Sequence, residues 1–294
     1  MLMCSVVNRL IAKKINLYIE LMRLDKPIGI YLLLWPTLWS LWIASGGEPN
    51  WIVVLIFYLG TIIMRSAGCV INDLADMKID PLVDRTKNRP LAKGSLSKNE
   101  ALLLFIFLIF IGFCLVLLLN RLSLYIAIFG AIITIFYPFS KRFFPAPQLF
   151  LGIAFSLGVP IAFVSQTNSM PLISWIIFLC TIVWIIFYDT QYAMADKKYD
   201  LKINIGSTAI LFGDYERLFI FIMQLIFLGF LVAIGILQSF NFLYFLSILF
   251  SSFLLIYQVF LIKDRDPKRC IRAFKNNNLV GAIIFAGIIS SYSF

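Results

Sequence analysis

The chain of 294 residues contains no histidine, and only 14% of its residues are charged. The lack of histidine excludes imidazole general bases, histidine-bound zinc and histidine-ligated haem. Five cysteines are scattered along the chain, and no two of them have the spacing of a metal or redox site. The sequence also lacks charged linkers and low-complexity tracts, so we expect a single domain that spans residues 1–294.

Apolar residues make up 61% of the chain, and its mean hydropathy is +0.94. A soluble domain is about half apolar and about a quarter charged, so this composition predicts an integral membrane protein. An apolar stretch of roughly 17–25 residues can cross a bilayer as a helix. We predict an all-α bundle of nine transmembrane helices, at 28–46, 51–71, 101–119, 122–139, 149–165, 171–188, 218–238, 241–262 and 279–294.

Basic residues lie almost entirely on one side of this predicted bundle. If the N-terminus is cytoplasmic, 24 of the 25 Lys and Arg residues lie on the inner side, and Arg121 alone lies outside. The positive-inside rule therefore predicts that the N-terminus is cytoplasmic. Topology and anionic lipid explain the net charge of +10, so we expect no nucleic-acid partner, and no obligate protein partner is evident. Residues 1–25 fit either a weak targeting helix or an amphipathic helix on the membrane surface, and we favour the second.

Two short acidic segments follow long apolar stretches on the predicted inner side. They hold Asn72, Asp73, Asp76 and Asp80 in the first segment, and Asp189, Asp196 and Asp200 in the second. Each contains Asp-x-x-x-Asp, and the two copies lie 120 positions apart, as a duplicated helical unit would place them. On continuous helices each set lines one face, where like charges repel unless a cation lies between them. Carboxylates in small number suit Mg²⁺, which often shares its coordination sphere with substrate phosphates, so the two segments could hold two ions.

Several basic side chains lie close to these acids in the sequence. They are Arg23, Arg65, Arg85, Lys87, Lys141, Arg142, Lys197 and Lys202. Each is either a positive-inside anchor or a contact for a substrate anion. The dense alternation of acid and base over residues 81–94 favours a lid over phosphate groups. Arg65 lies seven residues before Asn72, on the same helical face, which favours a place for Arg65 in the site.

These motifs together resemble the UbiA family of intramembrane prenyltransferases. The family pattern Asn-Asp-x-x-Asp-x-x-x-Asp is present at 72–80, and a second Asp-x-x-x-Asp is present at 196–200. Further segments are similar to the branch that prenylates 4-hydroxybenzoate in ubiquinone biosynthesis, including RLDKPIG at 23–29, DRTKNRPLAKG at 84–94, YPFSKR at 137–142 and NNNLVG at 276–281. One departure is Lys197-Lys198-Tyr199, which stands where the family has an acidic run.

The resemblance implies a bundle around a chamber that is open to the cytoplasmic face and laterally to lipid, in a bacterial cell inner membrane. It also implies Mg²⁺-dependent transfer of a polyprenyl group from polyprenyl diphosphate to the carbon ortho to the hydroxyl of 4-hydroxybenzoate. On this basis one ion is assigned to Asn72, Asp76 and Asp80, with Asp73 in or next to its coordination sphere, and the other to Asp196 and Asp200. The ring proton would pass either to a carboxylate, for which Asp189 is our choice, or to the released pyrophosphate.

Substrate contacts follow from the same resemblance. Phosphate contacts are assigned to Arg85, Lys87, Lys197 and Lys202, and Lys141, Arg65 and Tyr137 are further candidates for substrate binding. The acceptor carboxylate needs a cation, for which Arg142 is the first choice and Arg23 the second.

Two other classes of protein are weighed against this interpretation. A secondary transporter would place its ionisable residues inside the spans, whereas these lie at one face apart from Arg65. A lipid-binding structural protein would explain the basic loops but not the paired acids. Within the family, dihydroxynaphthoate, homogentisate and haem are alternative acceptors.

Overall fold

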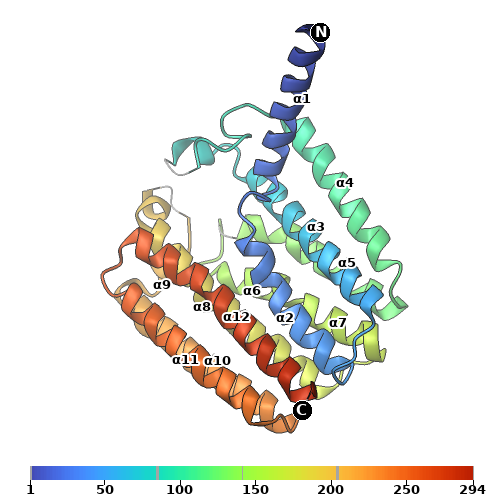
Figure 1. Cartoon of the computed structure of the whole chain (residues 1–294). Helices are drawn as coiled ribbons and strands as arrows, with labels where there is room; N and C mark the ends of the chain where they lie inside the picture. The colour runs from blue at the N-terminus through green and yellow to red at the C-terminus, as the bar shows by residue number, and fades with distance from the viewer. Residues whose placement is uncertain (1, 84–85, 141, 203–204, 294) are drawn as a thin grey trace.

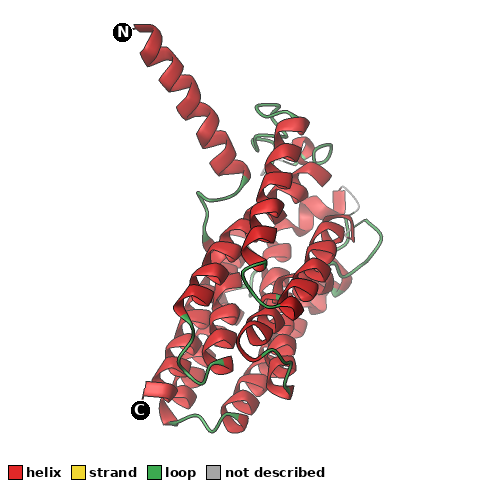
Figure 2. Cartoon of the chain, turned by 90° about the vertical axis from the view of Figure 1, so that its right-hand side faces the viewer, coloured by secondary structure: helices red, strands yellow, loops and turns green. Residues whose placement is uncertain are grey.

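The computed structural model of the chain describes residues 2–83, 86–140, 142–202 and 205–293. No strand occurs within these ranges, which confirms the all-α expectation (Figures 1 and 2). The helices are α1 (Leu2–Leu21), α2 (Ile28–Ala44), α3 (Trp51–Ala75), η1 (Asp80–Leu82), α4 (Lys98–Val116), α5 (Arg121–Ser140), α6 (Gln148–Ser156), α7 (Gly158–Thr167), α8 (Leu172–Lys202), α9 (Thr208–Leu211), η2 (Gly213–Tyr215), α10 (Glu216–Leu237), α11 (Phe242–Leu261) and α12 (Pro267–Ser293).

The chain is a multi-pass membrane protein. Within the described ranges, seven helical stretches are long and apolar enough to cross a membrane, namely α3, α4, α5, α6 with α7, α8, α10 and α11. The other two predicted spans are also helical. With 17 residues, α2 is at the lower end of spanning length. The predicted span 279–294 is the apolar part of α12, whose first turns carry several Lys and Arg residues.

The predicted fifth span, 149–165, lies within the candidate crossing Gln148–Thr167, which is not one unbroken helix. It consists of α6 and α7, which meet at Leu157. Pro160 lies inside α7. Its ring nitrogen has no N–H to donate to the carbonyl of Ser156, and the ring clashes with that carbonyl. The helix therefore breaks one turn before Pro160. Gly158 follows the break, and a Cβ there would lie 2.7 Å from Thr37 Oγ1, so glycine allows α7 to approach α2 closely.

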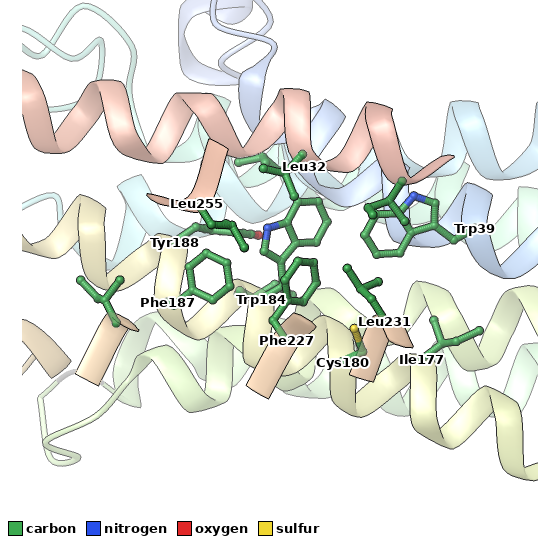
Figure 3. Packing of buried hydrophobic residues seen from close by; sticks show 14 of the residues in the cluster. Leu32, Trp39, Ile177, Cys180, Trp184, Phe187, Tyr188, Phe227, Leu231 and Leu255 are labelled. Carbon is green, nitrogen blue, oxygen red and sulfur yellow. The ribbon is translucent and has the colours of Figure 1, made fainter. Parts of the chain in front are cut away.

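The largest apolar core is built around the middle of α8. The indole of Trp184 is completely buried and stacks on Trp39 of α2 and on Phe227 of α10, with ring centroids 5.1 and 5.7 Å apart (Figure 3). Stacked aromatic pairs contribute about 0.5–1.5 kcal/mol each beyond the burial of their area. This packing fixes α8 between its neighbours, and α8 carries the second acidic segment at its C-terminal end.

Buried amides tie the same helices together next to this core. Gln258 of α11 accepts hydrogen bonds from Gln191 of α8 (2.9 Å) and Gln224 of α10 (3.2 Å), and donates one to Asn276 of α12 (3.0 Å). Asn277 of α12 donates to the carbonyl oxygen of Gln191 at 3.0 Å. Interhelical hydrogen bonds of this kind contribute about 0.6–2 kcal/mol each within membranes. The sequence analysis assigned no role to these residues.

The N-terminal helix extends away from the bundle, as Figures 1 and 2 show. The C-terminal part of α1 is packed: Leu21 is fully buried in a small cluster with residues of α3 and α4. An ion pair joins Lys14 Nζ to Glu100 Oε1 at 2.5 Å, between α1 and α4. The C-terminal end of α1 and the loop after it therefore lie beside the C-terminal half of α3.

Candidate active site

The first acidic segment lies where α3 ends. The helix stops at Ala75, Asp76 caps it, and Asp80 begins the short helix η1. The expectation that Asn72, Asp76 and Asp80 line one continuous helix was therefore wrong. Pro81 explains the difference, because proline disfavours a helical residue before it and cannot donate a hydrogen bond to the turn behind it. The chain instead turns sharply and folds Asp80 back toward α3.

Two arginines join the acids of this segment. Asp73 is 1% exposed, and its Oδ1 accepts hydrogen bonds from Arg23 Nη2 at 2.6 Å and Arg89 Nη1 at 3.1 Å. The same Arg89 nitrogen lies 2.8 Å from Asp80 Oδ2. Arg89 thus bridges two carboxylates from different elements, and Arg23 brings in the loop after α1. The distances are those of charge-assisted hydrogen bonds.

The carboxylate oxygens here fit a hard cation. Asp73 Oδ2 is buried and has no hydrogen-bond partner among the described residues. Burial raises the pKa of Asp80, and the neighbouring Asp73 and Asp76 raise it further, although Arg89 acts in the opposite direction. Among the described residues, no three acidic, histidine or cysteine side chains converge closely enough to hold a metal by themselves. Mg²⁺ bound here would complete its coordination sphere with waters and substrate phosphates.

The second acidic segment lies on one continuous helix. α8 runs without a break from Leu172 to Lys202, so Asp189, Asp196 and Asp200 have the helical spacing that was predicted. All three side chains are partly buried. Tyr137 of α5 links the two segments, because it interacts electrostatically with Asp76 and with Asp189. The structure therefore brings together the two segments, which are far apart in the sequence.

Arg142, the first choice for the acceptor, and Arg65, a further candidate for substrate binding, lie in different surroundings, whereas Arg23, the second choice for the acceptor, is paired with Asp73. Arg142 is exposed, and its Nη2 donates to the carbonyl of Ala75 at 2.6 Å, so it contacts the last turn of α3. Arg65 lies inside the α3 span, where its Nη1 is 2.9 Å from Cys69 Sγ and its guanidinium is 5.7 Å from the ring centroid of Phe155. Arg65 also interacts electrostatically with Tyr137.

Lys197, a predicted phosphate contact, is engaged with residues just before and at the start of α10. Its Nζ donates to the Gly213 carbonyl at 2.7 Å and lies 3.5 Å from Glu216 Oε2. Glu216 is completely buried at the start of α10, and its other oxygen accepts from Arg265 Nε at 2.6 Å. The contacts of Lys197 therefore hold the end of α8 against the loop before α10.

The remaining predicted contacts lie at the same end of the bundle or outside the described residues. Lys87 is exposed in the loop after η1, and Lys202 is exposed at the end of α8, 6.0 Å from the ring centroid of Tyr199. Arg85 and Lys141 lie outside the described residues.

Two charged residues of this region were not among the predicted site residues. Arg89 belongs to the DRTKNRPLAKG segment, and its place among mixed charges after the first acids was a usable signal. Glu216 had a weaker signal, an acid at the start of an apolar stretch, where the helix dipole favours negative charge. Both act through partners that are distant in the sequence.

Comparisons with known proteins agree on one family. The sequence model of the UbiA prenyltransferase family matches residues 33–282. A 4-hydroxybenzoate octaprenyltransferase of Coxiella burnetii (strain CbuK_Q154) is 50% identical over 275 residues, which cover 94% of this chain and 96% of the relative. The apo structure of a UbiA homolog from Aeropyrum pernix K1 has a TM-score of 0.77 at 25% identity, covering 89% of this chain and 97% of that one. A UbiA homolog from Archaeoglobus fulgidus bound to GPP and Mg²⁺ shares the fold, with a TM-score of 0.71 at 18% identity over 95% of this chain and 100% of that one.

Proposed function

The chain belongs to the UbiA prenyltransferase family, and we propose that it transfers a polyprenyl group from polyprenyl diphosphate to 4-hydroxybenzoate, a step of ubiquinone biosynthesis. The observation that carries this proposal is 50% identity, over 94% of the chain, with a 4-hydroxybenzoate octaprenyltransferase. The arrangement of two aspartate segments at one end of an apolar bundle supports it, because such a site can stabilise a departing diphosphate next to a lipid tail.

We propose nine crossings in one domain, with the N-terminus and the site facing the cytoplasm of a bacterial cell. The helices α2 and α12 would supply the two crossings beyond the seven found by length and hydropathy. The segregation of 24 of 25 basic residues supports the orientation. A chamber open to the cytoplasmic face and to lipid would admit the soluble acceptor from one side and the donor tail from the other.

We assign the metal sites to the two acidic segments. Asn72, Asp76 and Asp80, with Asp73, would hold one Mg²⁺, and the second segment, through Asp196 and Asp200, would hold the other; the buried, unpartnered Oδ2 of Asp73 supports this. Bound Mg²⁺ would neutralise charge on the diphosphate as its bond to the allylic carbon breaks. The Archaeoglobus fulgidus homolog, which shares the fold, has been solved with GPP and Mg²⁺.

The side chains of the protein then have three tasks in the transfer. Arg89 keeps Asp73 and Asp80 together and presents positive charge toward the diphosphate. As the carbon–oxygen bond of the donor breaks, the ring carbon ortho to the acceptor hydroxyl attacks the allylic carbon. The ring proton then passes to Asp189 or to the released diphosphate, which restores the aromatic ring. Apolar helices around the site exclude water that would otherwise capture the allylic cation.

We assign the acceptor carboxylate to Arg65 rather than to Arg142, the first choice from the sequence. A carboxylate in an apolar chamber needs a cation that is itself shielded from water, because the attraction between charges is stronger there. Arg65 is partly buried in the α3 span, next to Phe155 and electrostatically coupled to Tyr137, whereas Arg142 is exposed and contacts the Ala75 carbonyl.

The proposal is tested in membranes that contain the expressed chain, with radiolabelled 4-hydroxybenzoate and a polyprenyl diphosphate. We expect label in the lipid extract when Mg²⁺ is present, and none when EDTA replaces it. Membranes with the Asp196→Ala variant serve as the matched control. Efficient prenylation of homogentisate or dihydroxynaphthoate with no transfer to 4-hydroxybenzoate would assign a different acceptor and refute the proposal.

A further inference from the structure

A completely buried carboxylate lies outside the two acidic segments, at the start of α10. Glu216 accepts a hydrogen bond from Arg265 Nε at 2.6 Å through one oxygen, and its other oxygen lies 3.5 Å from Lys197 Nζ. Arg265 belongs to the loop between α11 and α12, and its Nη2 also contacts Asp214 Oδ1 at 3.3 Å. Lys197 donates in addition to the Gly213 carbonyl at 2.7 Å. The group therefore joins three segments that are far apart in the sequence.

Two features show that this group costs free energy to assemble. An ionised carboxylate loses its hydration when it is buried, and an apolar side chain of similar volume often stabilises a protein as well or better. Arg265 has a backbone φ of 57°, a left-handed conformation that is unfavourable for residues other than glycine. The group is therefore better explained by what it orients than by what it adds to stability.

The α10 side of the group is firmly held by the core. Phe227 of α10 stacks on the buried Trp184, with ring centroids 5.7 Å apart, and Gln224 donates to Gln258 at 3.2 Å. Glu216 precedes these residues on the same helix, so packing that does not involve the acidic segments fixes its place. Glu216 can therefore serve as a fixed partner for a more exposed side chain.

The last two turns of α8 are less buried than the helix before them. Residues 193–195 are buried, whereas every side chain from Asp196 to Lys202 is partly buried or exposed. Lys197 lies one residue after Asp196, about 100° around the helix from the face that Asp196 and Asp200 share. A hold on Lys197 therefore sets the rotation of these turns, and with it the direction of both carboxylates.

We infer that Glu216 is a positioning residue for the second acidic segment, an inference that rests on the proposed function. Acting through Lys197, it holds Asp196 and Asp200 in the direction in which they would meet the metal. Lys197 is then bound by the protein itself, and its task differs from the phosphate contact predicted from the sequence. Loss of a side chain that orients metal ligands weakens metal binding about tenfold to a hundredfold.

A double-mutant cycle with Glu216→Gln and Lys197→Met tests the inference. Glutamine keeps the shape of Glu216 without its charge, and methionine keeps the apolar stem of Lys197 without its ammonium group. The measured quantity is the Mg²⁺ concentration for half-maximal transfer by the purified full chain, with farnesyl diphosphate and 4-hydroxybenzoate. Each single variant should raise it by about tenfold and leave the KM for 4-hydroxybenzoate unchanged. The double variant should not exceed the larger single effect, because both changes break one interaction.

Arg269→Gln is the matched control. Arg269 of α12 forms an exposed ion pair with Asp264, in the loop that also holds Arg265. Its loss should leave the half-maximal Mg²⁺ concentration unchanged. A change that only destabilises the fold would lower the amount of active protein, and thus the maximal rate, without altering this concentration.

A second measurement needs neither metal nor substrate. Hydrogen–deuterium exchange of the metal-free protein should be about tenfold faster at the amides of residues 197–202 in both single variants, because the end of α8 opens more often. Exchange around Trp184 should stay as in the wild type. If Glu216→Gln does not fold, Lys197→Met decides by the same two measurements, since it leaves Glu216 paired with Arg265.

An unchanged half-maximal Mg²⁺ concentration in Lys197→Met, or unchanged exchange at residues 197–202, would overturn the inference. Effects that add in the double variant would also overturn it, because Lys197 would then contact the diphosphate independently of Glu216. A failure of the proposed function would appear instead as no transfer by the wild-type chain, and the exchange measurement would still test the hold on α8.

Discussion

Arg89 gives the sharpest mutational prediction, because one nitrogen of its guanidinium contacts two buried carboxylates. Nη1 lies 3.1 Å from Asp73 Oδ1 and 2.8 Å from Asp80 Oδ2, and the Arg89 side chain is only 17% exposed. Arg89→Ala would leave these two acids close together, with the hydrogen bond from Arg23 still made to Asp73. Removing one partner of a buried ion pair costs about 3–5 kcal/mol, since the remaining charges lose their compensation.

We expect about 3 kcal/mol of this cost to appear at the donor site, which corresponds to a loss of about a hundredfold in kcat/KM for the polyprenyl diphosphate. The KM for 4-hydroxybenzoate should change much less, because we propose Arg65, and not Arg89, as the contact of the acceptor. Arg89→Lys should recover part of the activity, since it restores the charge without the planar guanidinium.

The assay is steady-state transfer by purified variants, with each substrate varied in turn. Lys93→Ala is the control, because Lys93 is exposed in the same loop. Donor kinetics of Arg89→Ala equal to those of Lys93→Ala would refute the role given to Arg89. An equal rise in both KM values would point to general distortion of the site instead.

Three further predictions follow from the arrangement of charges. Asp196→Ala should abolish turnover while the protein still inserts in the membrane; normal turnover would refute a second metal site. In a cysteine-free background, a cysteine at Asn50 should react with an impermeant reagent from outside the cell and one at Asn88 should not, and the reverse pattern would invert the topology. Arg65→Ala should raise the KM for 4-hydroxybenzoate by about tenfold to a hundredfold, the loss of one charge-assisted contact, and Arg142→Ala should raise it less; the opposite order would return the carboxylate to Arg142.

Hydropathy and charge predicted the helices well, because a membrane segment must satisfy its backbone internally and be apolar over most of its length. All nine predicted stretches are helical within the described residues, and the family read from the aspartate motifs is confirmed by the match over 33–282. The expectation of one helical face for Asn72, Asp76 and Asp80 was wrong, because Pro81 separates Asp80 from α3. There local backbone chemistry outweighed the acidic pattern. Near Pro160 the fifth stretch divides at Leu157 but is still a candidate span.

The side-chain partners could not be predicted in the same way. The Arg89 bridge depends on a loop that folds back on α3, and the Lys197–Glu216–Arg265 group joins α8, α10 and the loop before α12. Such contacts depend on tertiary packing, which a single sequence does not encode as a local pattern. The sequence identified the acidic segments and basic loops, whereas it left open which cation meets which carboxylate.

The central claim is that this chain joins a prenyl group to the ring of 4-hydroxybenzoate with the help of Mg²⁺ bound at its two acidic segments. The most direct measurement incubates the purified protein with 4-hydroxybenzoate, farnesyl diphosphate and Mg²⁺, and identifies the product by mass and by NMR of the ring protons. We predict a single product with the prenyl group on the carbon ortho to the hydroxyl, and no product with EDTA or with Asp196→Ala. Undiminished product formation in EDTA, or a prenyl group attached through oxygen, would contradict the claim.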